Sequence, residues 1–171
     1  GVAQVGEDVS DETIQEVQDS MLAHLFCCRT FKGNEVIGRH DAIRDIIVRY
    51  GRIAGGSAQA EPPHLGGHEG RHRPDALIKL RTGERFVTDV TIVLPGAAAT
   101  VQKAAEKKGY AAGQAAQGKH REYDGMAANA NMKMLPFAME TLGHLDDEAQ
   151  ELLDRLIDSY HLHVERTTDP G

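Results

Sequence analysis

The middle of the sequence reads Arg73-Pro74-Asp75-Ala76-Leu77-Ile78-Lys79-Leu80, then Arg81-Thr82-Gly83-Glu84, then Arg85-Phe86-Val87-Thr88-Asp89-Val90-Thr91-Ile92-Val93. It predicts a β-hairpin, because residues 76–80 and 85–94 are rich in aliphatic and β-branched side chains and Gly83 permits a tight turn. Neither half alternates between polar and apolar side chains. Such runs are typical of strands covered on both faces, in the middle of a layered α/β fold.

Two aspartates of this hairpin are candidate metal ligands. Asp89 lies inside an apolar strand, where a carboxylate is costly unless it is paired, hydrogen-bonded or bound to a metal. Asp75 lies at the start of the neighbouring strand, so a hairpin of this length can bring the two side chains together. We therefore expect Asp75 and Asp89 to share one divalent cation.

The composition limits the class of protein. The chain has 171 residues, of which 40% are apolar, enough for one domain with a core. A net charge of −7 argues against broad electrostatic capture of nucleic acid but allows a local basic patch. Cys27 and Cys28 are the only cysteines and adjacent cysteines rarely pair, which favours a reducing, intracellular location. No apolar run matches a membrane span, no signal peptide is visible, and a chain opening on Gly1 reads as a fragment.

Helices are predicted on both sides of the hairpin from the spacing of apolar residues. Ser10 starts a helix over 11–25, and its stripe is Ile14, Val17, Met21, Leu22 and Leu25. A second helix covers 39–53 and ends at Gly55-Gly56. Its apolar face is Ile43, Ile46, Ile47, Tyr50 and Ile53.

The remaining segments complete a mixed sheet. Residues 57–61 form a short edge strand, and the breakers between Pro62 and Arg73 favour a loop. Helix is expected over 97–116 and again over 119–130, followed by a strand over 132–139 in which Pro136 favours an edge position. Asp146 caps a last helix, and its buried stripe is Leu152, Leu153, Leu156, Ile157 and Tyr160. This order predicts an α/β fold, a central mixed β-sheet flanked by helices.

Four segments carry a family resemblance. They are Arg39-His40-Asp41-Ala42-Ile43-Arg44-Asp45, Arg73-Pro74-Asp75, Thr88-Asp89-Val90-Thr91-Ile92-Val93 and Pro136-Phe137-Ala138-Met139-Glu140-Thr141. In this order they resemble the restriction-like endonuclease domain of early-branching non-LTR (LINE-type) retrotransposons, a member of the PD-(D/E)xK nuclease superfamily. The resemblance covers residues 24–160. It implies a restriction-endonuclease-like fold over 35–164, preceded by an N-terminal helix and a partial zinc knuckle over 1–34 and followed by a flexible tail over 165–171.

The resemblance also implies an activity. It is metal-dependent nicking of target DNA, in which Asp75 and Asp89 hold Mg²⁺ or Mn²⁺ and Glu61 adds a further ligand. Such a cation activates a water and offsets charge that builds on the phosphate. DNA is the implied partner, with a reverse transcriptase domain of the same polyprotein as a second one, and the implied location is the nucleus.

The implied lysine departs from the simple superfamily motif. Thr91 stands where that motif has Lys, two residues after Asp89. In the resembling family the lysine comes from the following helix, near a tyrosine, which implies Lys107 or Lys108 ahead of Tyr110. Arg73, Lys103 and Tyr110 are then expected to contact DNA. The alternative for these lysines is a solvated helix face with Glu106 as local partner; His40 and Asp45 are expected to hold their helix against the loop.

A zinc site is a separate expectation. The family often carries two cysteines followed by His-x-x-x-Cys, and His24 and Cys28 fit the second half. Zinc needs four ligands, which Cys27 and His40 could complete. The alternative is that Cys27 and Cys28 are small buried apolar residues.

Three functions therefore stay open from the sequence. The first is a divalent-metal-dependent DNA endonuclease. The second is a catalytically inactive, nuclease-derived nucleic-acid- or protein-binding module, favoured by the acidic charge and by Thr91. The third is a zinc-stabilised interaction domain centred on His24, Cys27 and Cys28.

Overall fold

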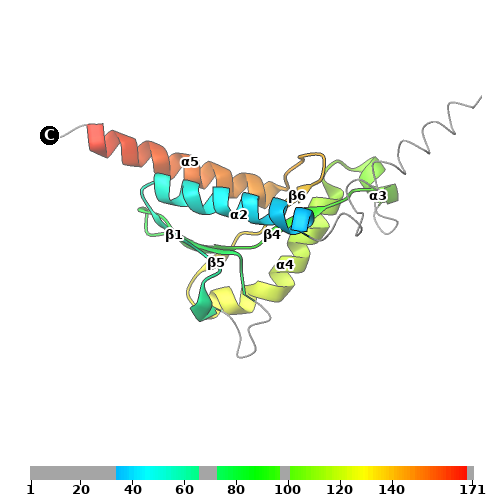
Figure 1. Cartoon of the computed structure of the whole chain (residues 1–171), viewed down its shortest axis with the longest axis horizontal. Helices are drawn as coiled ribbons and strands as arrows, with labels where there is room; N and C mark the ends of the chain where they lie inside the picture. The colour runs from blue at the N-terminus through cyan, green and yellow to red at the C-terminus, as the bar shows by residue number, and fades with distance from the viewer. Residues whose placement is uncertain (1–33, 66–72, 97–100, 169–171) are drawn as a thin grey trace, which may run out of the picture.

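The computed structural model describes residues 34–65, 73–96 and 101–168 of the chain (Figure 1). The elements are α2 (Asn34–Ile53), β1 (Ser57–Ala60), the 3₁₀ helix η1 (Pro63–Leu65), β2 (Ala76–Lys79), β3 (Arg85–Thr88), β4 (Val90–Val93), α3 (Val101–Glu106), α4 (Tyr110–Asn129), β5 (Lys133–Met134), β6 (Phe137–Glu140) and α5 (Asp147–Thr168). None of the helices in the described ranges is both long and apolar enough to cross a membrane.

The strands form a mixed sheet, as predicted. β1 pairs antiparallel with β2, β2 pairs antiparallel with β3, and β3 pairs parallel with β5. β4 pairs parallel with β6 as a separate ladder. The four strands β1, β2, β3 and β5 meet the pair β4 and β6 at Asp89, the single residue that separates β3 from β4. The carbonyl of Asp89 accepts a hydrogen bond from the amide of Phe137 at 3.0 Å. Pro136 interrupts β5 and β6 at the same level, on an outer strand as expected.

Helices cover both faces of this sheet. α2 and α5 lie side by side over one face, and α4 crosses the other (Figure 1). Neighbouring strand residues point to opposite faces: Ile78 and Phe86 join the cluster under α2 and α5, whereas Leu77 and Val87 join the cluster under α4. The prediction that the hairpin is buried on both faces is therefore confirmed.

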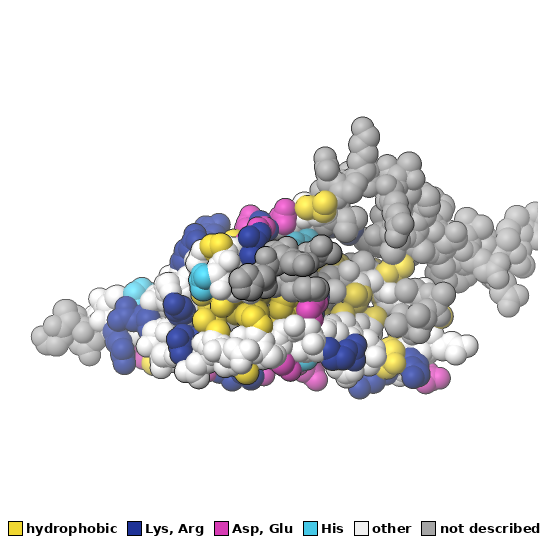
Figure 2. Space-filling model, turned by 90° about the horizontal axis from the view of Figure 1, so that it is seen from below, with side chains coloured by type: hydrophobic (Ala, Val, Ile, Leu, Met, Phe, Trp, Pro, Cys, Tyr) yellow, Lys and Arg dark blue, Asp and Glu magenta, His cyan; other side chains and the backbone are white. Residues whose placement is uncertain are grey.

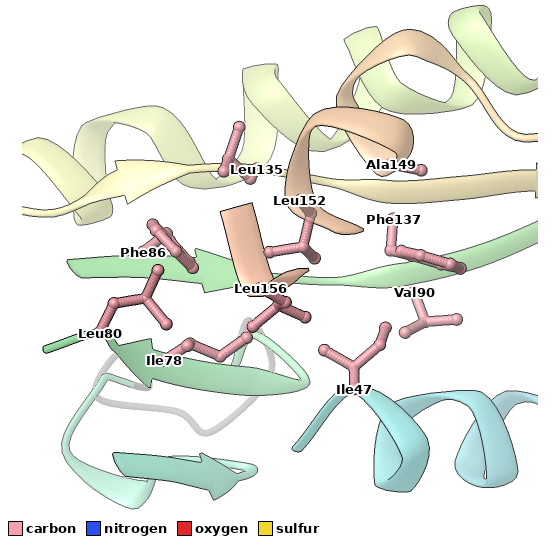
Figure 3. Packing of buried hydrophobic residues seen from close by; sticks show 10 residues of the cluster. All are labelled: Ile47, Ile78, Leu80, Phe86, Val90, Leu135, Phe137, Ala149, Leu152 and Leu156. Atoms are coloured by element: carbon pink, nitrogen blue, oxygen red, sulfur yellow. The ribbon is translucent and has the colours of Figure 1, made fainter. Parts of the chain in front are cut away.

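The larger cluster lies between the sheet and the pair α2 and α5 (Figure 3). Its buried members are Ile47, Ile78, Leu80, Phe86, Val90, Leu135, Phe137, Ala149, Leu152 and Leu156. Leu152 and Leu156 of α5 point toward the strands in Figure 3, one helical turn apart, as the spacing predicts. The face under α4 holds the smaller cluster that includes Leu77 and Val87, and beside it a group of buried alanines formed by Ala112, Ala116 and Ala138.

Helix boundaries differ from the sequence prediction in several places. α2 begins at Asn34, five residues before the predicted start at Arg39. The helix expected over 97–116 is divided, because Gly109 adopts a left-handed φ of 75° between α3 and α4. α4 then continues without a break through residues 117–118. The tail expected to fray from Glu165 is helical as far as Thr168, and η1 gives regular structure to part of the predicted loop.

The start of α5 is as predicted, but its buried stripe is only partly correct. The Asp146 carboxylate accepts a hydrogen bond from the Ala149 amide at 3.0 Å, which is an N-cap. Leu152 and Leu156 are buried, whereas Ile157 is 52% exposed and Tyr160 is 43% exposed. Ile157 and Tyr160 lie toward α2 rather than toward the sheet. Apolar periodicity identifies the apolar face of a helix, but it does not say whether that face packs on the sheet or on a neighbouring helix.

Candidate functional site

The hairpin register brings Asp75 and Asp89 together. Ala76 pairs with Thr88, and continuing that register by one position places Asp75 opposite Asp89. Side chains at opposite positions have Cβ atoms about 4.5–5.5 Å apart. The carboxylates are largely enclosed, with 15% of the Asp75 side chain and 7% of the Asp89 side chain exposed. The turn between β2 and β3 thus sets the strand register, and this register brings the two acids into one site.

Two hydrogen bonds orient Asp75. Its Oδ2 accepts the amide of Val90 at 2.7 Å and lies 2.8 Å from Nε2 of His40, which projects from α2. The other ring nitrogen of His40 lies 3.2 Å from Asp41. Because the Val90 amide bonds to a side chain, it is taken out of the backbone ladder, and this accounts for the interruption at Asp89. Both of these bonds fall on Oδ2 of Asp75.

Lys119 of α4 supplies a positive charge at the second acid. Its Nζ lies 2.7 Å from Oδ1 of Asp89 and 3.7 Å from Oε2 of Glu122. The same Nζ stands 5.7 Å from the ring centre of Tyr123, within range of a cation–π contact. The Tyr123 hydroxyl donates to the carbonyl of Arg73 at 3.4 Å. These contacts connect α4 to both strands of the hairpin.

Burial and neighbouring charge shift the pKa values at this site. Burial raises the pKa of Asp89 above its ordinary value and the negative charge of Asp75 adds to this, while the bond to Lys119 acts in the opposite direction. Burial lowers the pKa of Lys119, but Asp89, Glu122 and Asp75 outweigh burial and raise it overall. Burial, with Asp89 and Glu122 nearby, also raises the pKa of Tyr123. At neutral pH Lys119 is a hydrogen-bond donor and Tyr123 keeps its proton.

An arginine pair lies beside the acids and is bridged by Glu61. Oε1 of Glu61 accepts from Arg44 at 2.9 Å, and Oε2 bonds to Arg73. Glu61 has a positive φ of 43°, unusual for a residue with a side chain, and its amide donates to the Asp75 carbonyl at 2.7 Å. Both oxygens of the carboxylate expected to bind a metal are therefore engaged by arginine in this structure.

The structure places the other expected site residues away from the acids. Lys107 and Lys108 are exposed between α3 and α4, and Lys103 lies 5.6 Å from the ring centre of Tyr110. Tyr110 precedes Lys119 by nine residues, which is roughly 14 Å along a helix. The lysine that meets the acids from the helix after the hairpin is therefore Lys119, rather than Lys107 or Lys108.

Two contacts hold the start of α4, the helix that carries Lys119. The buried carboxylate of Glu140 accepts the Ala111 amide at 3.3 Å, at the helix end that favours negative charge. At Gly109 a Cβ would come within 2.3 Å of the His144 ring, so the chain approaches that ring closely. One sequence signal could have identified Lys119: it lies one helical turn before Tyr123, so the two side chains share a helix face.

The donor set fits a hard divalent cation better than zinc. Asp75 and Asp89 offer carboxylate oxygens, and Mg²⁺ or Mn²⁺ binds through one or two carboxylates while keeping several waters. Within the described ranges no three His, Cys, Asp or Glu side chains converge as a metal site. The zinc residues expected from the sequence, His24, Cys27 and Cys28, lie outside the described residues.

The visible surface carries both signs of charge. In Figure 2 Lys and Arg side chains gather in separate groups with Asp and Glu between them, rather than forming one broad basic face. Arg44 and Arg73, which Glu61 bridges, form one such local group.

No protein-family model matches the chain, and no curated protein matches it.

Proposed function

We propose that this chain is a divalent-metal-dependent DNA endonuclease with a restriction-endonuclease-like fold, similar to the nuclease domain of non-LTR retrotransposons. The observation that carries the proposal is the convergence of Asp75 and Asp89 across the hairpin, with Lys119 only 2.7 Å from Asp89. Paired carboxylates with one enclosed cationic donor suit hydrolysis of a phosphodiester. The mixed sheet with helices on both faces supports the same family.

In this proposal the two aspartates hold Mg²⁺ or Mn²⁺. When bound, the cation lowers the pKa of its water and offsets negative charge on the phosphate. Asp75 is preoriented, because His40 and the Val90 amide fix Oδ2. Asp89 must be ionised to bind a cation, and its raised pKa makes metal affinity increase with pH through that pKa.

Lys119 acts as a charged donor in this proposal. Its raised pKa keeps it protonated at neutral pH, so it contacts the phosphate or orients the attacking water and does not serve as a general base. The ring of Tyr123 and the carboxylate of Glu122 keep its Nζ near the acids after a cation reduces the pull of Asp89.

DNA would be bound by the arginine pair beside the acids. Arg44 and Arg73 are held by Glu61, and guanidinium groups bind phosphate in the same two-pronged way as carboxylate. DNA phosphates would therefore compete with Glu61 for Arg73, and with Glu61, Asp41 and Asp45 for Arg44. A reverse transcriptase partner and a nuclear site of action belong to this proposal through the resemblance alone.

Nicking of supercoiled plasmid tests the proposal. The wild-type protein is expected to nick DNA with Mg²⁺ or Mn²⁺ and to stop when the metal is chelated. Asp75→Asn and Asp89→Asn should each lower the rate about 1000-fold or more, equivalent to roughly 4 kcal/mol of transition-state stabilisation. Asp154→Asn, at an exposed acid of α5, is the matched control and should leave the rate unchanged. Equal nicking by all four proteins would contradict the assignment.

A catalytically inactive binding module is the second candidate. It is favoured by the ion pair between Lys119 and Asp89, because these charges already satisfy each other within the chain. It predicts salt-sensitive DNA binding by the wild-type protein without cleavage. Metal-dependent turnover that disappears in Asp75→Asn would eliminate it.

A further inference from the structure

A groove lined by apolar side chains lies between α2 and α5. Its lining residues are Ile46, Tyr50, Ile53, Leu153, Leu156, Ile157 and Tyr160, and its volume is about 500 Å³. Five of them are large side chains with high exposure: Ile46 at 53%, Tyr50 at 55%, Ile53 at 41%, Ile157 at 52% and Tyr160 at 43%. Scattered apolar residues are normal on a surface, but a contiguous group of this kind marks a binding surface.

The groove has the form that accepts a helix. Ile46, Tyr50 and Ile53 recur at four and three residues along α2, and Leu153, Ile157 and Tyr160 repeat that spacing on α5. Each helix therefore presents one apolar ridge to the groove, and the two helices lie side by side (Figure 1). An amphipathic helix laid between the ridges would bury its apolar face against both.

We propose that residues 10–25 of the same chain bind in this groove as an amphipathic helix. The segment has a capping Ser10 and an apolar stripe, formed by Ile14, Val17, Met21, Leu22 and Leu25. At helical spacing its acidic residues Glu12, Glu16 and Asp19 lie on the opposite side, where they would face solvent. The segment thus offers one apolar face, which is what the groove requires.

The length of the connection supports this occupant over a separate molecule. Residues 26–33 join the segment to α2 and can span up to about 28 Å when extended. Ile46 lies 12 residues after Asn34, roughly 18 Å along α2, and so falls within reach. A tether of this length gives an effective concentration in the millimolar range. A second copy of the chain would have to match that concentration in solution.

Cysteine crosslinking in the full-length chain tests the proposal. In a Cys27→Ser, Cys28→Ser background, Leu22→Cys is combined with Tyr50→Cys or with Ile157→Cys and treated with a short bismaleimide. The matched control pairs Leu22→Cys with Arg121→Cys, because Arg121 is exposed on α4, across the sheet. We expect crosslinking within one molecule at a yield at least tenfold above that of the control pair.

A second variant separates docking from general misfolding. Val17→Asp places a charge in the apolar stripe and should lower both groove crosslinks about tenfold, with the melting transition of the domain retained. Equal yields for the groove and control pairs, or a yield unaffected by Val17→Asp, would overturn the proposal. Crosslinks formed only between two molecules would overturn it as well and assign the groove to a second copy. Neither readout depends on nuclease activity.

Discussion

The sheet face under α2 and α5 is packed by one large cluster of aliphatic and aromatic side chains, whereas the face under α4 is divided between a smaller cluster that includes Leu77 and Val87 and a group of alanines. The two acids are contacted from both faces, since His40 of α2 bonds to Asp75 and Lys119 of α4 pairs with Asp89. Small side chains let α4 approach the strands closely enough for a lysine to pair with a strand carboxylate. We therefore expect the first face to supply the larger share of the stability, while the second face supplies the positive charge that pairs with Asp89.

The largest expected effect is on stability, at the face under α2 and α5. Leu152 is fully buried there, so Leu152→Ala should lower the free energy of unfolding by about 2–5 kcal/mol. On the α4 face, Ala116→Gly should cost about 1 kcal/mol, mainly through helix propensity. Urea denaturation followed by circular dichroism measures both values. Equal losses would mean that the two faces contribute alike.

The next effect is on catalysis, at the α4 face. Lys119→Met keeps the length of the side chain but removes its charge, and should lower the single-turnover nicking rate about 100-fold, near 2.7 kcal/mol. Lys107→Met is the control and should leave the rate unchanged, because Lys107 is exposed between α3 and α4. The reverse result, with Lys107 essential and Lys119 dispensable, would restore the lysine expected from the sequence.

A smaller effect is expected on DNA affinity. Glu61→Gln removes the carboxylate that pairs with Arg73, so the Arg73 guanidinium becomes available to phosphate, while Arg44 stays paired with Asp41 and Asp45. Affinity measured by fluorescence anisotropy at low salt should rise about fivefold, or near 1 kcal/mol. Glu84→Gln is the control, since Glu84 pairs with Arg155 of α5. Weaker Mn²⁺ binding by Glu61→Gln would instead identify Glu61 as a metal ligand.

The smallest effect is a pH-dependent contact between α4 and α5. His120 lies 2.7 Å from Asp124 and 2.8 Å from Glu148; burial lowers the pKa of His120, but these two acids outweigh burial and raise it. A raised pKa gives stability that is complete below the ordinary histidine value and is lost as pH rises through the folded value. His120→Gln should therefore cost about 0.5–1 kcal/mol in mildly acid solution and little in alkaline solution. A loss of unfolding free energy that is the same at both pH values would refute the charged contact.

The sequence predicts the hairpin and its surroundings well, because their signals are local. Apolar runs on either side of Gly83, the outer position of the strand around Pro136 and the cap at Asp146 each depend on a few neighbouring residues. The breaks at Pro136 and Asp89 were not predicted, since both strands were expected to be continuous. The same hairpin places Asp75 opposite Asp89, because the length of the turn determines which residues of the two strands pair. Fold class and both acids were therefore accessible from the sequence.

The position of the lysine was not accessible in this way. An Ala- and Gly-rich segment has no clear apolar period, so its helix boundaries are poorly specified, and the left-handed Gly109 shifts the start of α4. The exposed apolar side chains of α2 and α5 show a second limit. Periodicity identifies an apolar helix face, but it does not say whether the partner is the sheet or another segment, as Tyr50 and Tyr160 illustrate.

The carboxylate of Asp75 has two tasks, since it accepts the Val90 amide and faces the second acid. Asparagine retains an acceptor for that amide, whereas alanine leaves a partly buried N–H without a partner, at a cost of about 1–3 kcal/mol. In a relative without the proposed activity, position 75 would therefore stay constrained by the backbone, and position 119 by the buried Asp89. An aspartate or asparagine at position 75 would thus be evidence of a shared backbone geometry rather than of activity.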